Sequence, residues 1–339
     1  MSFIWLLPTI KFKSEGANLL LFDQKTALRI DGLGVHGANF LGQLDGTRQE
    51  QFLVTSPVAA TLLPLLDQHG WLVRLKRDIR SVIKHRAWIS RQLSYYAHLT
   101  QNHPDSILDD LSRATALIIG AGGIGSHVAY SLAAAGVGNL IITDKDTIEE
   151  SNLNRQFLYH REDIGNYKAP VVAENIRTRF PPINILSIVV DYDSTPIATE
   201  LPQADIVVMC GEVSSLLDNS RLVGETAFLV AGYLGAQGVV GPLLCPARGT
   251  PCLQCVMTNA GRKDVRELDF EDDIRMHGWN SSASTINGVV GNLAAEVVMH
   301  SLSNSLNSPL CLNETILINM RTLELTREPV PIIKCKHSR

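Results

Sequence analysis

The chain has 339 residues, of which 45% are apolar and 19% are charged, and its formal net charge is −4. This composition is typical of a globular protein and leaves no basic excess of the kind that binds nucleic acid. The sequence has no run of about 18 apolar residues, and its apolar start lacks a basic segment and a small-residue cleavage site. We therefore expect a cytoplasmic protein of about two domains, with no membrane span and no signal peptide.

The first 85 residues have the pattern of a small module of their own. Short apolar stretches predict strands, and one leucine-rich stretch predicts a helix. The predicted strands are 3–7, 10–12, 19–22 and 71–74, and the predicted helix is 58–66. Strands and short helices in so small a segment favour a winged-helix-like domain over residues 1–85, followed by a polar, mostly helical connector over 81–112.

From residue 114 onward, apolar strands alternate with helices. A buried strand at 116–119 is followed by a helix at 124–135 that Gly136 ends, and then by a strand at 140–143. Further elements of the same kind are a helix at 171–180 and strands at 185–190 and 206–209. This rhythm predicts an α/β fold over residues 86–339, namely a Rossmann-like, doubly wound, mainly parallel sheet with helices on both faces.

A glycine-rich loop joins the first of these strands to its helix. It contains Gly120, Gly122, Gly123 and Gly125, with one residue between the first two and one between the last two. Glycines let the backbone approach phosphates closely, and the following helix offers free N–H groups. Asp144 ends the next strand, where a carboxylate can accept hydrogen bonds from ribose hydroxyls. The loop predicts nucleotide binding but does not distinguish NAD from ATP.

The segment after Asp144 favours ATP. It carries Asp146 and then a Ser-Asn-Leu-Asn-Arg-Gln run that contains Asn152 and Arg155, and Lys168 follows three residues after Gly165. Hydride transfer develops little new phosphate charge and needs no fixed cations here. Adenylyl transfer does need them, because the α-phosphate and the leaving pyrophosphate gather negative charge.

Taken together, GxGGxG, DxD, SNLNRQ and GxxK resemble the superfamily of ubiquitin-activating enzymes and of the bacterial molybdopterin- and thiamine-pathway adenylating enzymes, over about residues 88–320. The resemblance implies that Asp144 binds the ribose, that Asp146 belongs to the nucleotide site, and that Asn152, Arg155 and Lys168 hold the ATP phosphates. It also implies that Arg91 is an arginine finger that reaches into the site of a neighbouring subunit. In this sequence Trp88 stands where the family's R-x-x-R-Q pattern has its first arginine.

The same resemblance implies a magnesium ion near the α-phosphate. The family carries an aspartate after the strand that here ends near residue 209, whereas this chain has Glu212 at the best-matching position. Mg²⁺ accepts carboxylate ligands, so Glu212 is the first candidate and Asp218 the second.

A structural zinc ion is the second metal that the resemblance implies. Cys252 and Cys255 form one Cys-x-x-Cys pair, and Cys335 matches the start of the second pair. Ser338 replaces the last cysteine, so His337 would complete a Cys₃His site that leaves no open position for catalysis. The alternative is a degenerate site without metal.

Two further regions bear on the reaction and on assembly. Residues 256–285 correspond to the family's crossover loop and contain no cysteine, so we expect adenylation without a cysteine relay. Cys210, Cys245 and Cys311 lie in or beside apolar stretches and are expected to be core residues. The helix pattern over 287–300 matches family members that dimerise, which implies a homodimer.

The N-terminal module resembles that of the branch that modifies ribosomally made peptides such as microcin C and pantocin A. In that branch the module clamps a precursor peptide by strand addition, here to an edge strand at 19–22 or 28–30. The implied function is ATP-dependent adenylation of a carboxyl or amide group of the peptide, in antibiotic biosynthesis. Three alternatives stay open: an activator of a ubiquitin-like sulfur carrier, a non-catalytic leader-binding partner, and an NAD-dependent oxidoreductase.

Overall fold

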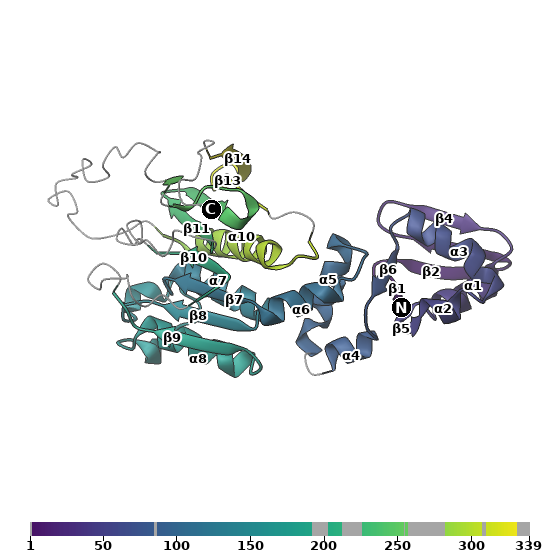
Figure 1. Cartoon of the computed structure of the whole chain (residues 1–339), viewed down its shortest axis with the longest axis horizontal. Coiled ribbons are helices and arrows are strands. Elements are labelled where there is room, and N and C mark those ends of the chain that lie inside the picture. Colours follow the sequence, from purple (N-terminus) through teal and green to yellow (C-terminus); the bar gives the residue numbers. More distant parts are fainter. Residues whose placement is uncertain are drawn as a thin grey trace. The chain divides into compact units, whose positions relative to one another are not determined.

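The structure is a computed structural model, and it describes residues 2–84, 87–191, 203–211, 226–253, 255–256, 282–306 and 310–330. The chain forms two compact units (Figure 1). The first is Met1–Asp110 with Ser303–Asn307, and the second is Leu111–Leu302 with Ser308–Arg339. The functional division at residue 85 stays a prediction.

The first unit is built around an antiparallel sheet in the order β5-β1-β6. Its strands are β1 (Phe3–Leu6), β5 (Asp45–Gln49) and β6 (Leu72–Leu75), and the main helices beside them are α1 (Gly34–Leu41) and α3 (Pro57–Gln68). The apolar face of α3 contributes Leu62 and Leu66, both fully buried, to the common core. The predicted strands and helix of this segment are present, while its winged-helix character stays a prediction.

A second antiparallel sheet of the first unit has the order β2-β3-β4, with β2 at Lys11–Glu15, β3 at Asn18–Phe22 and β4 at Ala27–Ile30. One of the two candidate edge strands is therefore wrong, because 19–22 lies in β3, between its two neighbours. Leu19 and Leu21 of β3 are fully buried, which suits a central strand. The other candidate, 28–30, lies in β4 at an edge of this sheet.

The connector after β6 is helical, as predicted. Its helices are α4 (Ile79–Ile83), α5 (Ser90–Leu99) and α6 (Asp105–Arg113), and the first unit also contains the short α2 (Glu50–Leu53). Asp105 opens α6 in a fully buried position, where its carboxylate accepts hydrogen bonds from the backbone N–H groups of Lys76 and Arg77 at 3.0 and 3.2 Å. These bonds satisfy the buried charge and fix the start of α6 to the end of β6.

The described residues of the second unit contain an eight-stranded sheet in the order β14-β13-β12-β11-β10-β7-β8-β9. The strands from β11 to β9 in this order run parallel, and β12, β13 and β14 continue the sheet antiparallel. The prediction of an α/β fold with a mainly parallel sheet is confirmed. The strand bounds are β7 Thr115–Ile119, β8 Asn139–Thr143, β9 Asn184–Ile188, β10 Ile206–Met209, β11 Ala227–Leu234, β12 Gln237–Leu244, β13 Glu314–Asn319 and β14 Glu324–Pro329.

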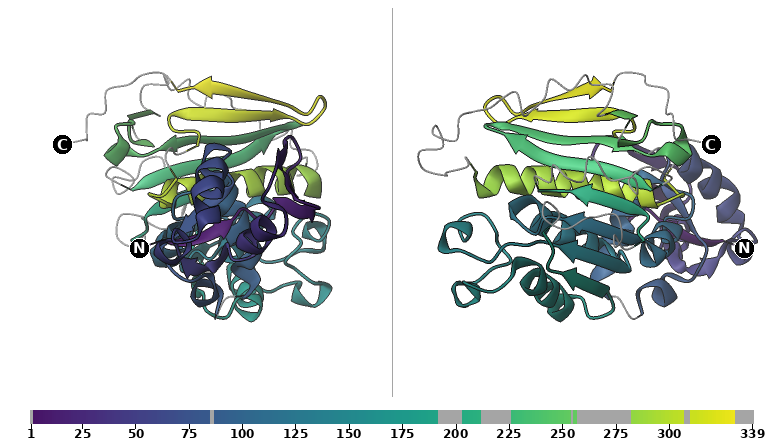
Figure 2. Two further views of the ribbon diagram at one scale, coloured as in Figure 1. Left: turned by 90° about the vertical axis from the view of Figure 1, so that its right-hand side faces the viewer. Right: turned by 60° about the vertical axis from the view of Figure 1, so that its left-hand side comes forward.

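In the described ranges three long helices accompany this sheet: α7 (Gly123–Ala135), α8 (Lys168–Arg179) and α10 (Ser284–Leu302). Helix α10 packs along α7 and against β11 and β12, as Figures 1 and 2 show. Gly136 ends α7 in the left-handed conformation, with φ of 92°, as its position in the sequence predicts. No helix in the described ranges combines the length and apolarity that crossing a bilayer requires. This packing places the start of α7 and the start of α10 side by side at the carboxyl end of the parallel strands.

Candidate functional site

The glycine loop follows β7 and opens α7, at the carboxyl edge of the sheet. Gly120 has φ of +94°, which favours glycine, and its N–H group donates to the carbonyl oxygen of Thr143 at the end of β8 over 2.8 Å. A Cβ atom on Gly125 would overlap the carbonyl oxygen of Gly120, so the loop can fold onto its helix only with glycine there. The first N–H groups of α7 have no partner within the helix, and helix N-termini of this kind bind anions in many proteins.

Asp144 directly follows β8 and holds two loops together. One carboxylate oxygen accepts a hydrogen bond from the N–H group of Ala121 at 2.6 Å, and the other accepts one from the N–H group of Asp146 at 2.8 Å. Burial raises the pKa of Asp144, and the two backbone hydrogen bonds oppose that shift. Tyr159 supports the loop from another segment, because its hydroxyl donates to the Ala121 carbonyl. Burial raises the Tyr159 pKa far above its usual range, so the hydroxyl stays a neutral donor.

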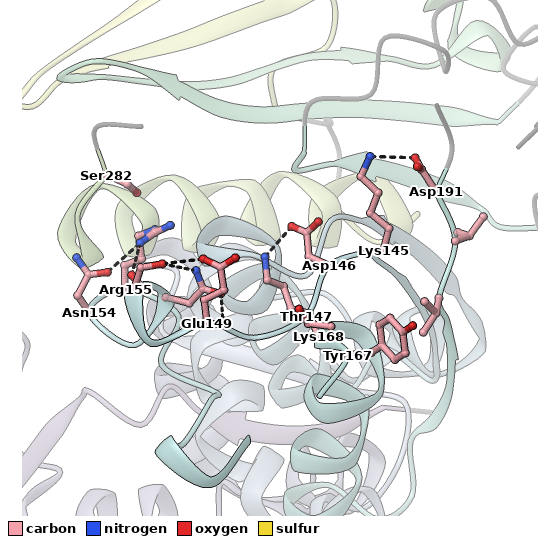
Figure 3. A pocket seen from close by; sticks show the side chains of 14 residues that line it. Lys145, Asp146, Thr147, Glu149, Asn154, Arg155, Tyr167, Lys168, Asp191 and Ser282 are labelled. Atoms are coloured by element: carbon pink, nitrogen blue, oxygen red, sulfur yellow. Dashed lines mark hydrogen bonds and ion pairs between the residues drawn. The ribbon is translucent and has the colours of Figure 1, made fainter. Parts of the chain in front are cut away.

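A pocket of about 880 Å³ is lined by Lys145 and Asp146, the two residues that follow Asp144 in the chain (Figure 3). Four residues that the sequence assigns to the nucleotide site line it together: Asp146, Asn152, Arg155 and Lys168. The glycines of the loop and Asp144 are not among its lining residues. The full lining is Lys145, Asp146, Thr147, Glu149, Ser151, Asn152, Asn154, Arg155, Tyr167, Lys168, Val189, Val190, Asp191 and Ser282.

Lys168 begins α8 and points back at Asp146. Its N–H group donates to the Asp146 carbonyl oxygen at 2.9 Å, and Thr147 and Tyr167 form an isolated antiparallel bridge beside it. The Lys168 Nζ lies 2.8 Å from Asp146 Oδ2, and the two side chains are 9% and 53% exposed. Backbone hydrogen bonds thus hold the segment of Asp146 against the segment of Lys168. This pairing fixes the buried Lys168 ammonium group at the pocket wall.

Arg155 follows a short 3₁₀ helix at Glu150–Asn152. Its Nη1 donates to the Ser151 carbonyl oxygen at 2.8 Å and to Asn154 Oδ1 at 3.0 Å, both uncharged acceptors. Within the described ranges it meets no carboxylate, so its charge is available to an anionic ligand. This local geometry presents the guanidinium group to the pocket (Figure 3).

Asn152 supports the same turn and is 5% exposed. Its Oδ1 accepts a hydrogen bond from the Glu149 N–H group at 3.1 Å, and its Nδ2 lies 3.4 Å from the Ser151 hydroxyl oxygen. Asn152 therefore fixes the turn that carries Arg155, which is a local role that the sequence motif did not reveal.

The formal charges of the pocket lining balance, with three cations, Lys145, Arg155 and Lys168, against three carboxylates, Asp146, Glu149 and Asp191. Lys145 pairs with Asp191 at 3.0 Å across its rim, and Lys168 pairs with Asp146. Arg155 is the cation whose described partners are neutral oxygens. A polyanion that enters here would meet the Lys168 ammonium group and the Arg155 guanidinium group, which both line the pocket.

Other predicted site residues are not brought to this pocket by the described part of the chain. Arg91 lies on α5 in the first unit and its side chain is exposed. Glu212 and Asp218 lie outside the described residues. The backbone of Gly211, which follows β10, approaches Gly120 so closely that a Cβ on Gly120 would stand 3.0 Å from the Gly211 nitrogen. The end of β10 therefore reaches the glycine loop, and the role of Glu212 stays a prediction.

The zinc prediction also stays open. Cys252 and Cys255 are 1% and 3% exposed, so the first Cys-x-x-Cys pair is buried. Cys335 and His337 lie outside the described residues, and the described ranges contain no group of three or more metal-binding side chains. Two buried thiols fit half of a structural site, and the structure does not test the other half.

The sequence did not mark two buried amides beside the glycine loop, Gln156 and Asn287. Gln156 directly follows Arg155, and Asn287 comes from the first turn of α10. A motif reading could have noted Gln156 as the end of the SNLNRQ run. Asn287 had no such signal, because only the packing of α10 on α7 brings it to the loop.

A comparison with known families decides the broader assignment. The model of the ThiF family matches residues 91–338, which is most of the chain. The chain belongs to the ThiF family. Among curated ThiF-like relatives, SUMO-activating enzyme subunit 2 of Dictyostelium discoideum is 33% identical over 174 residues, which cover 47% of this chain and 24% of that protein. Sulfur carrier protein ThiS adenylyltransferase of Bacillus subtilis is 32% identical over 152 residues, covering 43% of this chain and 45% of that protein.

The chain thus spans less than half the length of these relatives, whereas solved structures match it from end to end. Crystal structures of E. coli MccB with ATP superpose with a TM-score of 0.74, at 22% identity and 100% coverage of both chains. The structure of PaaA superposes with a TM-score of 0.68, at 15% identity, covering 96% of this chain and 99% of that one. At these identities the likeness concerns the fold, which this ThiF-family chain shares over both of its units.

Proposed function

We propose that this chain is an ATP-dependent adenylyltransferase that activates a carboxyl or amide group of a bound precursor peptide. One observation carries the proposal: the pocket beside the glycine loop joins a buried ammonium group, Lys168, to a guanidinium group, Arg155, that meets no carboxylate in the described ranges. Cations placed beside a helix N-terminus suit a triphosphate chain better than a hydride carrier.

The proposed chemistry relies on positioning and charge. ATP would place its ribose near Asp144 and its phosphates between α7, Lys168 and Arg155. A carboxylate oxygen of the substrate attacks the α-phosphorus, the bond to the bridging oxygen breaks, and pyrophosphate leaves. Both products of that step carry negative charge that Lys168 and Arg155 are placed to stabilise. The acyl-adenylate is then captured by a nucleophile of the substrate.

A peptide substrate is supported by the likeness of the whole chain to MccB. Those structures include MccB with AMPCPP and MccA, and a complex with N-formylated MccA is described as that of a microcin C7 biosynthetic enzyme. The match includes the unit that precedes the ThiF-family segment, and β4 there is an edge strand of its sheet. An edge strand offers unpaired backbone groups to an extended peptide. The same likeness supports the proposal of a role in antibiotic biosynthesis.

Metals and assembly complete the proposal. Glu212 would hold Mg²⁺, and Cys252 and Cys255 would hold a structural zinc ion together with Cys335 and His337. Arg91 would serve the site of a second subunit in a homodimer, as the family pattern implies.

A second candidate is the activation of a sulfur-carrier protein. The observation that favours it is the relationship to the ThiS adenylyltransferase of Bacillus subtilis. Both candidates share the adenylation step and differ in the acceptor, so the acceptor decides between them.

The test measures pyrophosphate release from ATP by the purified chain, with synthetic candidate precursor peptides or with purified ThiS as acceptor. We expect release with the peptide and not with ThiS, and we expect Arg155→Ala to abolish release while peptide binding is retained. Undiminished release by Arg155→Ala would remove the site assignment. Release with ThiS alone would replace the first candidate by the second.

A further inference from the structure

Asn287 occupies an unusual position at the start of α10. It is 1% exposed, and it lies so close to the glycine loop that a Cβ atom on Gly123 would overlap its side-chain amide. Its Nδ2 donates to the hydroxyl oxygen of Ser282 at 3.2 Å, whereas its Oδ1 is buried and has no hydrogen-bond partner among the residues that the structure describes. A buried amide oxygen without a partner is destabilising and rare, so it calls for an explanation.

A second buried amide stands beside the same loop. Gln156 is 4% exposed, and its Oε1 also lacks a hydrogen-bond partner within the described part of the chain. Its Nε2 would lie 3.8 Å from a Cβ atom on Gly122. Two amides from different elements therefore meet Gly122 and Gly123, the residues at the N-terminus of the 13-residue helix α7, and each keeps one polar atom unsatisfied. Both unsatisfied atoms are acceptor oxygens, so an anion at the helix N-terminus can use these amides only if an amide turns its N–H groups toward it.

Ser282, the hydrogen-bond partner of Asn287, can bond to the amide in either of its two orientations. A serine hydroxyl is both a donor and an acceptor, and an asparagine amide presents oxygen on one side and nitrogen on the other. If the Asn287 amide turns by half a rotation, Ser282 donates to Oδ1 instead of accepting from Nδ2. Both N–H groups of Asn287 are then free to donate to an anion at the start of α7. With an anion bound, every polar atom of the Asn287 amide would have a hydrogen-bond partner, whereas without the anion Oδ1 has none among the described residues.

We propose that Asn287 is a phosphate-binding residue, which turns its amide to donate to the phosphate chain of the bound nucleotide while Ser282 changes from hydrogen-bond acceptor to donor. This inference rests on the proposed function, because it places ATP at α7. Ser282 also lines the pocket that contains Arg155, so the turn of one amide connects the glycine loop to the pocket wall.

The test compares ATP with adenosine, which lacks phosphates, by isothermal titration calorimetry on Asn287→Leu. A lost hydrogen bond to a charged oxygen weakens ATP binding by roughly tenfold to a hundredfold, and adenosine binding stays unchanged. The thermal midpoint of the ligand-free variant should be equal or higher, because leucine has a similar size and removes the unpaired oxygen. If Asn287 had only a packing role, Asn287→Leu would lower the thermal midpoint and would not weaken ATP binding selectively.

Asn292→Leu is the matched control. Asn292 lies on the same helix, but it is exposed and both ends of its amide are already paired, with Gly288 and Ser131 at 2.7 Å each. It should bind ATP and adenosine as the wild type does. Ser282→Ala provides a variant with minimal risk to folding, and it should weaken ATP binding severalfold without changing adenosine binding.

The outcomes separate this inference from the function on which it rests. ATP binding at wild-type strength by both Asn287→Leu and Ser282→Ala overturns the inference alone, as does an equal loss of ATP and adenosine binding. A wild-type chain that binds no ATP overturns the proposed function and the inference with it. A selective loss of ATP binding in both variants supports the turned amide.

Discussion

Replacing Lys168 by methionine should lower the rate of the reaction much more than it lowers the stability of the fold. The substitution keeps the length of the side chain and removes a charge whose side chain is 9% exposed. Its partner Asp146 is 53% exposed, so water can solvate the carboxylate that is left alone. The loss of stability should therefore be near that of a surface pair, at about 1 kcal/mol, and below the cost of leaving a fully buried charge. For a unit of this size that corresponds to a fall of roughly 2–4 °C in the thermal midpoint.

The rate of pyrophosphate release should fall much further. Removing one group that stabilises developing charge in a transition state typically lowers the rate by about 10² to 10³. Stopped assays of pyrophosphate at saturating ATP measure that fall, and scanning calorimetry measures the midpoint. Arg161→Met is the control, because it also removes one positive charge from a paired side chain, here with Glu150 at 2.7 Å and 73% exposed. We expect its rate to match that of the wild type.

A second variant distinguishes two effects of the lost ammonium group. In Lys168→Met the unpaired Asp146 would also repel the phosphates and weaken ATP binding. Lys168→Met combined with Asp146→Asn should restore binding but leave the rate low. If the double variant also recovered the rate, Lys168 would act only by neutralising Asp146. If Lys168→Met released pyrophosphate at the wild-type rate, the role assigned to this ammonium group would be refuted.

Two further predictions concern the loop and the thiols. Gly125→Ala should lower the free energy of unfolding by about 1–3 kcal/mol and weaken ATP binding, because the new Cβ would overlap the Gly120 carbonyl oxygen. Denaturant unfolding measures the loss of stability. Gly42→Ala is the control and should be neutral, because Gly42 has φ of −62° and its Cβ would make only ordinary contacts. A loss no greater than that of Gly42→Ala would contradict the close approach. Burial raises the pKa of the Cys311 thiol to about 11, so iodoacetamide should label the native chain at pH 8 about a thousandfold more slowly than it labels a full thiolate. The labelling rate should rise as the pH approaches 11, and mass spectrometry of the labelled peptide measures that rate. Rapid labelling of the native chain at pH 8 would show that the thiol is not held in the core.

Much of the second unit could be predicted from the sequence because its signals are local. The strand before the glycine loop, the helix after it and the aspartate at the end of the next strand are set by short patterns, and the structure places them as expected. Strands β11 and β12, which pair antiparallel with each other, were not predicted, because Gly232, Gly235 and Gly238 interrupt the apolar pattern of this segment. Glycine in such a strand weakens the pattern from which strands are recognised.

Long-range pairing explains the other differences. The stretch 19–22 looked like a free edge, since nothing in its sequence shows that strands on both sides cover it. The pairing of Lys168 with Asp146 follows from a backbone bridge between two loops, which the motif spacing does not reveal. Asn287 meets the glycine loop only through the contact of α10 with α7. Residue types could thus be predicted at the site, while their partners depend on the fold.

The most direct test of the central claim is a crystal structure of the chain with a non-hydrolysable ATP analogue. We expect the ribose near Asp144 and the phosphates at the N-terminus of α7, within hydrogen-bonding distance of Arg155 and Lys168. A nicotinamide dinucleotide retained in this pocket, or an analogue bound with both cations turned away from its phosphates, would contradict it.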